Sequence, residues 1–524
     1  LFEAVRDAMK PLIDDGFLPG ATALDPAVAD FSQARDPAAA LALLDLSMAM
    51  VNNAGELAAE CAGIDHLGER IGEMGASVRF LCSYTFGLPS PEIHAGTPST
   101  GSPGATATRA RLEHIAERGD DHARIAEILR LFDLERSAWG RSALAATASC
   151  LLQASDPQRA ADMARRAVQA EPKNPTGESC APWVQLATVT HGTPSAASAA
   201  RAMQAWAPWD GYGWLFEAID HSGSPVALRY ARRAHVLSPL DTYVARVLAD
   251  ELFLRGAREE VRGIAVSLES VGYPAQRLAS ELLRVRVDAS LARFRAAFVR
   301  AAGAMQITAE DSGWARVQRF EIAWHALQLA ELLGAEATAR TADRIVEQFL
   351  APEPSPLDGG HLDVPLRIPG VCIRASAGLV GVCFSRFRAL RNHLSGGILP
   401  ETDRFTDGAE RYALGDFEGA ARAWRALLQD PAAYAGVMLD AMVDTFAHTR
   451  EGDLVNRLLA AVPDTSPDFH GASLAVVREA RWAAAQGETD RARTLAQRVV
   501  DAWSVADDTV PAVAEMRRLL SSLR

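Results

Sequence analysis

The sequence predicts an all-α protein assembled from helix–turn–helix hairpins, and three observations support this prediction. One stretch, 408–431, places apolar residues at helical spacing on both sides of a turn at Gly415-Asp416 and ends at Pro431. The order of small and large residues in this stretch returns at several other places in the chain. Aromatic residues make up only 7% of the sequence, and small residues are abundant, which suits helices packed closely side by side.

The 408–431 stretch sets the register for the rest of the chain. Gly408 and Ala420 are small where two helices must approach closely, and large residues are expected to fill the space around them. These large residues are Tyr412, Phe417, Trp424, Leu427 and Leu428. Ala420 is therefore expected to be buried against the preceding helix near Gly408.

The N-terminal segment, 1–95, is predicted to be helical without a clear repeat. Long apolar patterns cover Pro37–Ala62 and Asp65–Tyr84. The stretch Leu88–Ala107 is rich in Pro, Ser, Thr and Gly and has no periodicity, so we expect a mobile loop or linker there.

A first repeat array is predicted over 104–351. The segment Ser155–Pro172 matches the second helix of the 408–431 hairpin, with Ala160 and Ala164 at packing positions. Partial copies follow, centred on Ala197, Ala227, Val261, Ala292 and Ala339. The intervals between successive anchors are 37, 30, 34, 31 and 47 residues, and the first four scatter about one value.

A second array is predicted over 366–524. The stretch Pro352–Pro369 is rich in Pro and Gly and predicts the boundary between the arrays, because long structureless connections are uncommon inside compact domains. One helix is expected over Val371–His393. Copies of the hairpin then centre on Ala420 and on Ala492, the latter with a turn at Gly487, and the interval between them leaves room for one more copy at 452–461.

The 408–431 and 155–172 patterns resemble the tetratricopeptide (TPR) repeat, and the other copies are similar to it in part. The resemblance implies an α-solenoid of TPR-like repeats in two arrays, preceded by an irregular helical segment. It also implies a concave surface that holds a protein or peptide partner or a second copy of the chain. The C-terminal run from Ala480 through Trp503 to Met516 resembles, more loosely, the helical C-terminal arms of large bacterial Ser/Thr protein kinases.

Composition restricts the class of partner. The formal net charge is −13, which argues against broad nucleic-acid binding. The longest uncharged run near the cysteines, Ala375–Ser385, is too short to span a bilayer.

No C-x-x-C pair occurs, which favours free, structural thiols in a reducing compartment, and we expect a cytoplasmic protein. The chain begins at Leu1 rather than Met, which suggests that an N-terminal piece is missing from it. The cysteines are Cys61, Cys82, Cys150, Cys180, Cys372 and Cys383.

The sequence contains no Gly-rich phosphate loop, H-E-x-x-H, G-x-S-x-G or kinase catalytic loop. The segment 416–419 is similar to a kinase D-F-G motif, but it falls on the turn of the 408–431 hairpin. The histidines lack the spacing and the acidic partner that are typical of zinc sites. Cys372 and Cys383 are expected three turns apart on one helix, too far to share a metal. We therefore expect no catalytic residue, no cofactor and no metal site.

The densest aromatic group in the chain consists of Trp206, Trp209, Tyr212 and Trp214. Such rings are typical of binding hot spots, so this group is the candidate surface for a partner. The alternative is that the rings fill the junction between consecutive repeats. The first interpretation predicts that Trp209 or Trp214 is at least partly exposed on the concave side or at an array edge, and the second predicts full burial.

Three functional hypotheses follow. The leading one is a non-enzymatic scaffold for protein or peptide partners, because the repeats are present and catalytic motifs are not. The second is a regulatory or sensor arm of a multidomain bacterial signalling protein, such as a Ser/Thr kinase, whose catalytic domain lies outside this chain. The third is a helical hydrolase with a Cys/His site assembled between the arrays.

Overall fold

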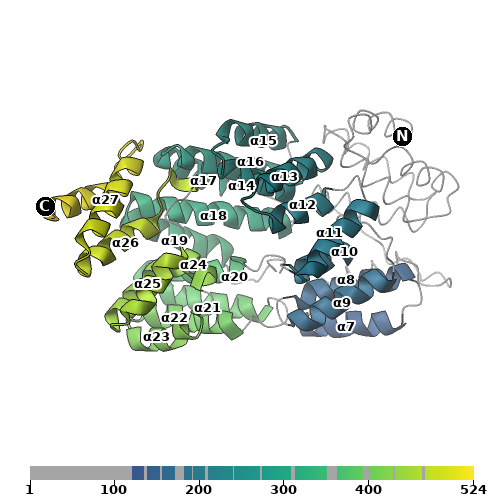
Figure 1. The fold of residues 1–524 in the computed structure, drawn as a ribbon. Helices are drawn as coiled ribbons and strands as arrows, with labels where there is room; N and C mark the ends of the chain where they lie inside the picture. Colours follow the sequence, from purple (N-terminus) through teal and green to yellow (C-terminus); the bar gives the residue numbers. More distant parts are fainter. Residues whose placement is uncertain are drawn as a thin grey trace. The chain divides into compact units, whose positions relative to one another are not determined.

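The computed structural model of the chain describes residues 121–134, 138–153, 156–170, 182–191, 193–206, 211–239, 241–271, 274–307, 313–350, 363–393, 400–428, 431–462 and 467–523. Every regular element in these ranges is a helix, so the predicted all-α class is confirmed there (Figure 1). The predicted N-terminal helices and linker, 1–107, lie outside the described residues. None of the described helices is long and apolar enough to cross a membrane.

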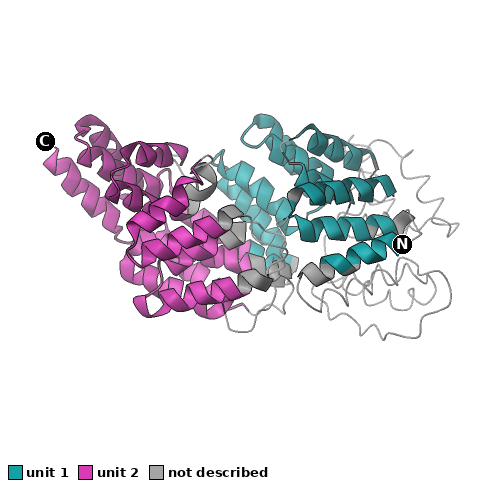
Figure 2. Ribbon diagram, turned by 90° about the horizontal axis from the view of Figure 1, so that it is seen from below, with its two compact units in different colours: residues 1–279, 310–312 teal, residues 280–309, 313–524 magenta. Residues whose placement is uncertain are grey.

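The chain divides into two compact units, which Figure 2 colours separately. Unit 1 covers 1–279 and 310–312, and unit 2 covers 280–309 and 313–524. The division falls within one helix, α16 (Pro274–Ser290). It does not coincide with the boundary that the sequence suggests at 352–369, because the described helices before and after that stretch pack together in unit 2.

Unit 1 is a succession of helices, and each one from α7 to α15 packs against the next. Helices one step further apart also touch, as α8 does with α10 and α12 with α14. The helices are α7 (Asp121–Leu134), α8 (Ala138–Leu152), α9 (Pro157–Ala170), α10 (Pro182–Val189), α11 (Pro194–Trp206), α12 (Tyr212–Asp220), α13 (Pro225–Leu237), α14 (Thr242–Phe253) and α15 (Arg258–Val271).

Unit 2 is also built from helices. Its elements are α17 (Phe294–Ala304), α18 (Gly313–Leu333), α19 (Ala335–Phe349), α20 (Asp363–Cys372), α21 (Ala377–His393), α22 (Pro400–Ala413), α23 (Phe417–Arg425), α24 (Pro431–His448), α25 (Gly452–Ala461), the 3₁₀ helix η2 (Pro467–Phe469), α26 (Leu474–Ala485), α27 (Thr489–Trp503) and α28 (Pro511–Ser522). Successive helices pack together from α17 to α21 and again from α22 to α28. In addition α22 touches α24, and α24 touches α26.

Five turns between helices share one backbone conformation. In each, a single residue takes a left-handed φ between 58° and 78°, and the next N–H donates to the carbonyl five residues back. This is the Schellman arrangement, which satisfies the last carbonyls of the preceding helix. The left-handed residues are Gly256, Ala292, Gly415, Arg450 and Gly487.

The residue five positions after each of these turns is fully buried in the following helix. These residues are Val261, Ala297, Ala420, Val455 and Ala492, each 0% exposed. The prediction that Ala420 is buried is therefore confirmed. The predicted register at Ala292 is wrong, because Ala292, although buried, lies in the turn, and Ala297 is the buried residue of the helix that follows.

Unit 1 carries comparable buried positions in its second helices. Ala160, Ala164 and Ala227 are each 0% exposed, as the sequence predicts for close helix packing. The register at Ala197 is off by one residue, since its neighbour Ala196 is the buried one and Ala197 is only partly covered.

The α22–α23 hairpin shows why its small residues are needed. A Cβ atom on Gly408 would lie only 2.2 Å from Trp424 Nε1, so the indole occupies the space that any larger residue would need. The same Nε1 donates a hydrogen bond of 3.0 Å to the Phe405 carbonyl. Tyr412 packs edge-on against Phe417, with ring centroids 5.7 Å apart. The packing predicted for this hairpin is thus present.

The last hairpins of unit 2 fold back onto α17. Trp503 meets Phe294 edge-on, with centroids 6.1 Å apart, and both are almost fully buried. Asp507 accepts hydrogen bonds from the backbone N–H groups of Arg295 and Ala296, at 2.9 and 3.0 Å. Residues about 210 positions apart in the sequence therefore pack into one hydrophobic core.

Candidate functional site

The aromatic group that the sequence singles out is described only in part. Trp209 lies outside the described residues, as does the side chain of Trp206 at the end of α11. Tyr212 and Trp214 lie on α12, and both are half-buried. The partial exposure that the first interpretation predicts for Trp209 or Trp214 is present at Trp214.

Trp214 already has partners within unit 1. The Arg233 guanidinium lies over its ring, 4.0 Å from the centroid, and Tyr230 lies against it at 5.7 Å. The ring also packs on the small core formed by Leu215, Ala234 and Val244. Trp214 therefore contributes to the junction between α12 and α13, as the alternative interpretation expects, and keeps part of its surface in solvent.

Tyr212 helps to organise the start of the next hairpin. Its hydroxyl donates to Asp241 Oδ2 at 3.0 Å, while Asp241 Oδ1 accepts from the N–H groups of Tyr243 and Val244 and so caps α14. Burial raises the pKa of Asp241, and these hydrogen bonds, with Val244 first, offset part of that effect. Tyr212 and Asp241 therefore connect α12 to the start of α14.

A second group of polar side chains, which the sequence analysis did not single out, lies on three adjacent helices of unit 2. We call Tyr412 on α22, Asp440 and Asp444 on α24 and Arg478 on α26 the polar row. Arg478 Nε lies 2.6 Å from Asp440 Oδ1, and Arg478 Nη1 lies 3.4 Å from Asp444 Oδ1. Tyr412 Oη donates to Asp444 Oδ2 at 3.2 Å. One chain of contacts therefore runs across the first helices of three successive hairpins.

The side chains of the polar row differ in their exposure to solvent. The side chain of Asp444 is 43% exposed, whereas Asp440 is 26% and Arg478 is 25% exposed. Burial, followed by the nearby carboxylate of Asp444, raises the pKa of Tyr412 from 10.0 to about 12. Tyr412 is thus a neutral hydrogen-bond donor at physiological pH, and Asp444 is the most accessible charge of the row.

A more deeply buried ion pair lies beside the row. Arg374 pairs with Glu331 of α18, and their side chains are only 13% and 17% exposed. Burial raises the pKa of Glu331, and Arg374 opposes that rise. Asp440 acts electrostatically on both members of the pair, so the pair and the row form one charge network.

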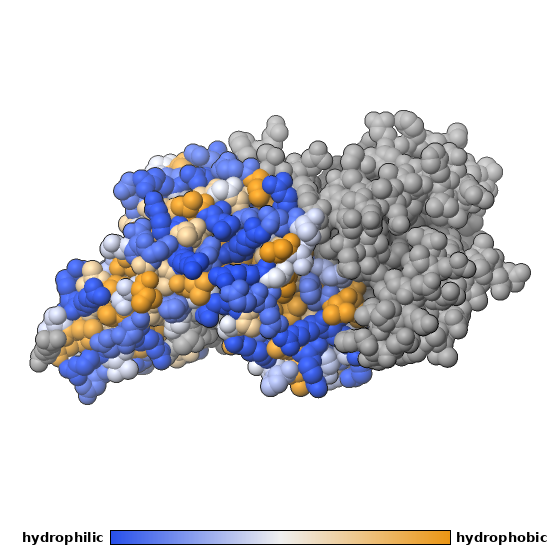
Figure 3. Space-filling model, turned by 90° about the horizontal axis from the view of Figure 1, so that it is seen from above, coloured by the Kyte–Doolittle hydropathy of each residue, from blue (hydrophilic) through white to orange (hydrophobic). Residues whose placement is uncertain are grey.

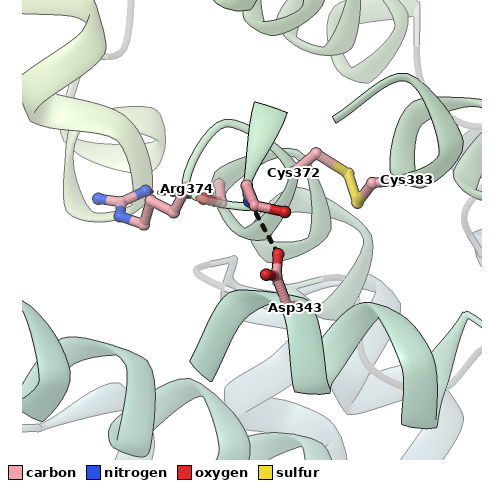
Figure 4. The surroundings of a disulfide bond; sticks show 6 residues. Asp343, Cys372, Arg374 and Cys383 are labelled. Atoms are coloured by element: carbon pink, nitrogen blue, oxygen red, sulfur yellow. Dashed lines mark hydrogen bonds between the residues drawn. A yellow bond between two sulfur atoms is a disulfide. The ribbon is translucent and has the colours of Figure 1, made fainter. Parts of the chain in front are cut away.

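The single helix expected over Val371–His393 is wrong. The first helix, α20, ends at Cys372, and α21 begins at Ala377 after a four-residue turn. The two helices fold against each other, which brings the Cα atoms of Cys372 and Cys383 to 5.4 Å, and their sulfurs form a disulfide (Figure 4). The irregular stretch predicted up to Pro369 is also shorter than expected, since α20 begins at Asp363.

All described cysteines are oxidised, because Cys150 is disulfide-bonded as well. The expectation of free thiols is wrong for these three residues. A disulfide sulfur is not a thiolate, so none of the three is available as the nucleophile of the hydrolase hypothesis. Among the described residues, no group of three or more His, Cys, Asp or Glu side chains is placed to hold a metal ion.

The surface seen in Figure 3 gives no sign of one broad apolar patch. Orange, apolar residues occur there in small groups separated by blue, polar ones. The exposed large apolar side chains of the described residues are correspondingly scattered, for example Leu134, Val266 and Leu414. The described part of the face in this view is therefore mainly polar.

The sequence contains one weak signal for the polar row. Asp440 and Asp444 are four residues apart, which places both carboxylates on one face of α24. Nothing in the sequence links them to Tyr412 or Arg478, which are more than 25 residues away. Comparison of the sequence with models of known protein families and with curated proteins finds no match to either.

Proposed function

We propose that the chain is a non-enzymatic scaffold, an α-solenoid of TPR-like repeats that holds a protein or peptide partner. The observation that carries the proposal is the recurrence of one unit. The same left-handed turn is followed, five residues later, by the same buried position in five hairpins. Stacks of such units expose long continuous faces, and binding is the common use of those faces.

The polar row is the surface that we assign to the partner. Its residues come from α22, α24 and α26, which touch one another in sequence, so their exposed side chains form one continuous face. Hydrogen bonds and ion pairs within the row fix the side chains before any partner arrives. A pre-ordered surface loses less conformational entropy on binding than a flexible one.

The charge of the row indicates the chemistry of the partner. Two carboxylates, Asp440 and Asp444, share the single guanidinium of Arg478. One negative charge is left over within the row, and it lies nearest to solvent at Asp444. A partner segment that presents an Arg or Lys side chain would complement this charge and could form a charge-assisted hydrogen bond.

The test uses peptides selected from a phage-displayed random library on the full chain. We expect enriched sequences that share an Arg or Lys at a fixed position. Asp444→Asn should weaken their binding by roughly tenfold, because a hydrogen bond to a charged group contributes about 1.5–3 kcal/mol. The matched control is Asp453→Asn, the same change on an exposed aspartate of α25, which should leave binding unchanged.

Two outcomes would overturn the proposal. Peptides that bind the two variants equally well would remove the polar row as the binding surface. A library that yields no enriched sequence, together with no self-association of the chain by light scattering, would remove the scaffold function itself.

A further inference from the structure

The Cys372–Cys383 disulfide joins two helices at a tight corner and is inaccessible to solvent. Both cysteines are 0% exposed, and Phe384 and Phe387 of the same corner are also buried. We propose that this chain folds in an oxidising compartment, and that the bond is a permanent staple of the corner rather than a redox switch.

The first part of the proposal rests on the oxidation state of the cysteines. Cys150, Cys372 and Cys383 are all disulfide-bonded. Forming the Cys372–Cys383 bond removes two protons and two electrons from two thiols, and the acceptor is the disulfide of a thiol–disulfide oxidoreductase, which becomes a dithiol. Such exchange runs in this direction outside the reducing cytosol, where glutathione and thioredoxin favour thiols.

The second part rests on burial. A disulfide is reduced when a thiolate attacks one of its sulfurs in line, so an exchangeable bond has to be reachable. At this corner the sulfurs belong to fully buried residues, and reduction requires the helices to open first. The bond is therefore made before or during folding and is protected afterwards.

The corner that the bond closes also positions polar groups of unit 2. The Ser376 N–H donates to Asp343 Oδ1 at 2.8 Å, and a dashed line marks this hydrogen bond in Figure 4. Arg374 comes from the same turn and pairs with Glu331. Without the bond, the four residues 373–376 would be held by these contacts and by hydrogen bonds within the turn, such as that from the Arg374 N–H to the Val371 carbonyl. The staple thus supports the ion pair that borders the polar row.

If the proposed scaffold function is correct, the partner must be present in the same oxidising compartment. This consequence depends on that function, whereas the staple does not. If the experiments below fail, the Asp444→Asn result is unaffected. If the Asp444→Asn experiment fails, the proposal about the disulfide is unaffected.

The oxidation state can be read directly from the protein in its source cells. The chain is recovered without reductant, its free thiols are alkylated under acid quench, and it is digested with trypsin. Cleavage after Arg367, Arg374 and Arg386 places the two cysteines on separate peptides, 368–374 and 375–386, so the bond appears as a linked pair. We expect this pair almost exclusively, in a non-cytosolic fraction. Alkylated Cys372 and Cys383, or an oxidised chain found in the reducing cytosol, would overturn the compartment assignment.

The staple is tested on the purified full chain with dithiothreitol. Loss of the linked pair should be roughly tenfold or more slower in the native protein than in urea, because the buried bond must be uncovered first. Equal rates would show an accessible bond and overturn the staple. As a second readout, dithiothreitol should lower the melting temperature of the wild type more than that of the Cys372→Ala/Cys383→Ala variant, which retains the Cys150 disulfide. Equal shifts would mean that the bond does not hold the corner.

Discussion

At the residue scale, two kinds of position should be most sensitive to substitution. At one, no space is left for a larger side chain, and at the other, a partly buried polar group depends on a particular hydrogen-bond partner. Gly408 is one, since the Trp424 indole fills the space beside its Cα. Tyr412 is another, since its hydroxyl is half-buried and donates to Asp444. The sequence identified the first from the order of small and large residues. It could not identify the second, because the partner lies 32 residues away on another helix.

Gly408→Ala should destabilise the protein although alanine favours helices. The added methyl group would meet the Trp424 ring and cost about 1–3 kcal/mol of unfolding free energy by overpacking. Ala420→Leu, in the facing helix, should lower the unfolding free energy by a similar amount. The control is Gly381→Ala in α21, where a Cβ meets nothing within 4 Å and the change should stabilise by about 0.5–1 kcal/mol. Urea unfolding measures all three, and equal effects at positions 408 and 381 would contradict the packing described.

Tyr412 should make the protein sensitive to alkaline pH. Its pKa is raised to about 12 in the folded protein from 10.0 in the unfolded chain, so the unfolded state ionises first as pH rises. The stabilisation is complete below pH 10 and is lost progressively as pH rises towards 12. Urea midpoints measured from pH 8 upward should fall more steeply for the wild type than for Tyr412→Phe. Parallel curves for the two proteins would show that this hydroxyl ionises normally.

At the scale of the element, five hairpins of different sequence share one turn conformation. Three of the five left-handed positions are glycine, and two of them, Gly415 and Gly487, are turns that the sequence predicts. The other two, Ala292 and Arg450, carry side chains and gave no such signal. The corner at 373–376 was missed for a related reason, because it contains neither Gly nor Pro to interrupt the helical pattern.

Substitutions at two equivalent positions of this turn should change the stability of the protein in opposite directions. Gly487→Ala should cost about 1–2 kcal/mol, because a left-handed backbone is unfavourable for any residue with a Cβ. Arg450→Gly, at an exposed position with φ 62°, should instead gain up to about 1 kcal/mol. Thermal and urea unfolding of the two variants provide the comparison. A loss at both positions would mean that the two turns are not equivalent.

At the scale of the whole molecule, long-range contacts decide how the helices of unit 2 are closed together. Asp507 caps the start of α17 from more than 200 residues away. Arg286 Nη2 pairs with Asp468 at 3.0 Å, and Trp503 packs on Phe294. The last hairpins are therefore part of the same cooperative core as α17, rather than a free end of an array.

Asp507→Ala should weaken this closure. Loss of a capping carboxylate costs about 0.5–2 kcal/mol, and the variant should unfold at correspondingly lower urea concentration. The adjacent Asp508→Ala is the control, since Asp508 accepts a local hydrogen bond from the Thr509 N–H and meets α17 through an exposed ion pair with Arg295 at 4.0 Å. Such a pair contributes about 0.5 kcal/mol or less. If both variants behaved alike, the cap would not contribute to the stability of unit 2.

The sequence by itself determined the properties that act within one hairpin. Helical periodicity, the glycine turns and the fit of Gly408 to Trp424 all involve residues close in the chain, where spacing fixes which side chains meet. The register was less secure, as the shifts from Ala197 to Ala196 and from Ala292 to Ala297 show. The tertiary structure alone decided the polar row, the disulfide corner and the closure onto α17. These join groups that are distant along the chain or separated by an unmarked turn, and their energies depend on burial and on partners that no local pattern reveals.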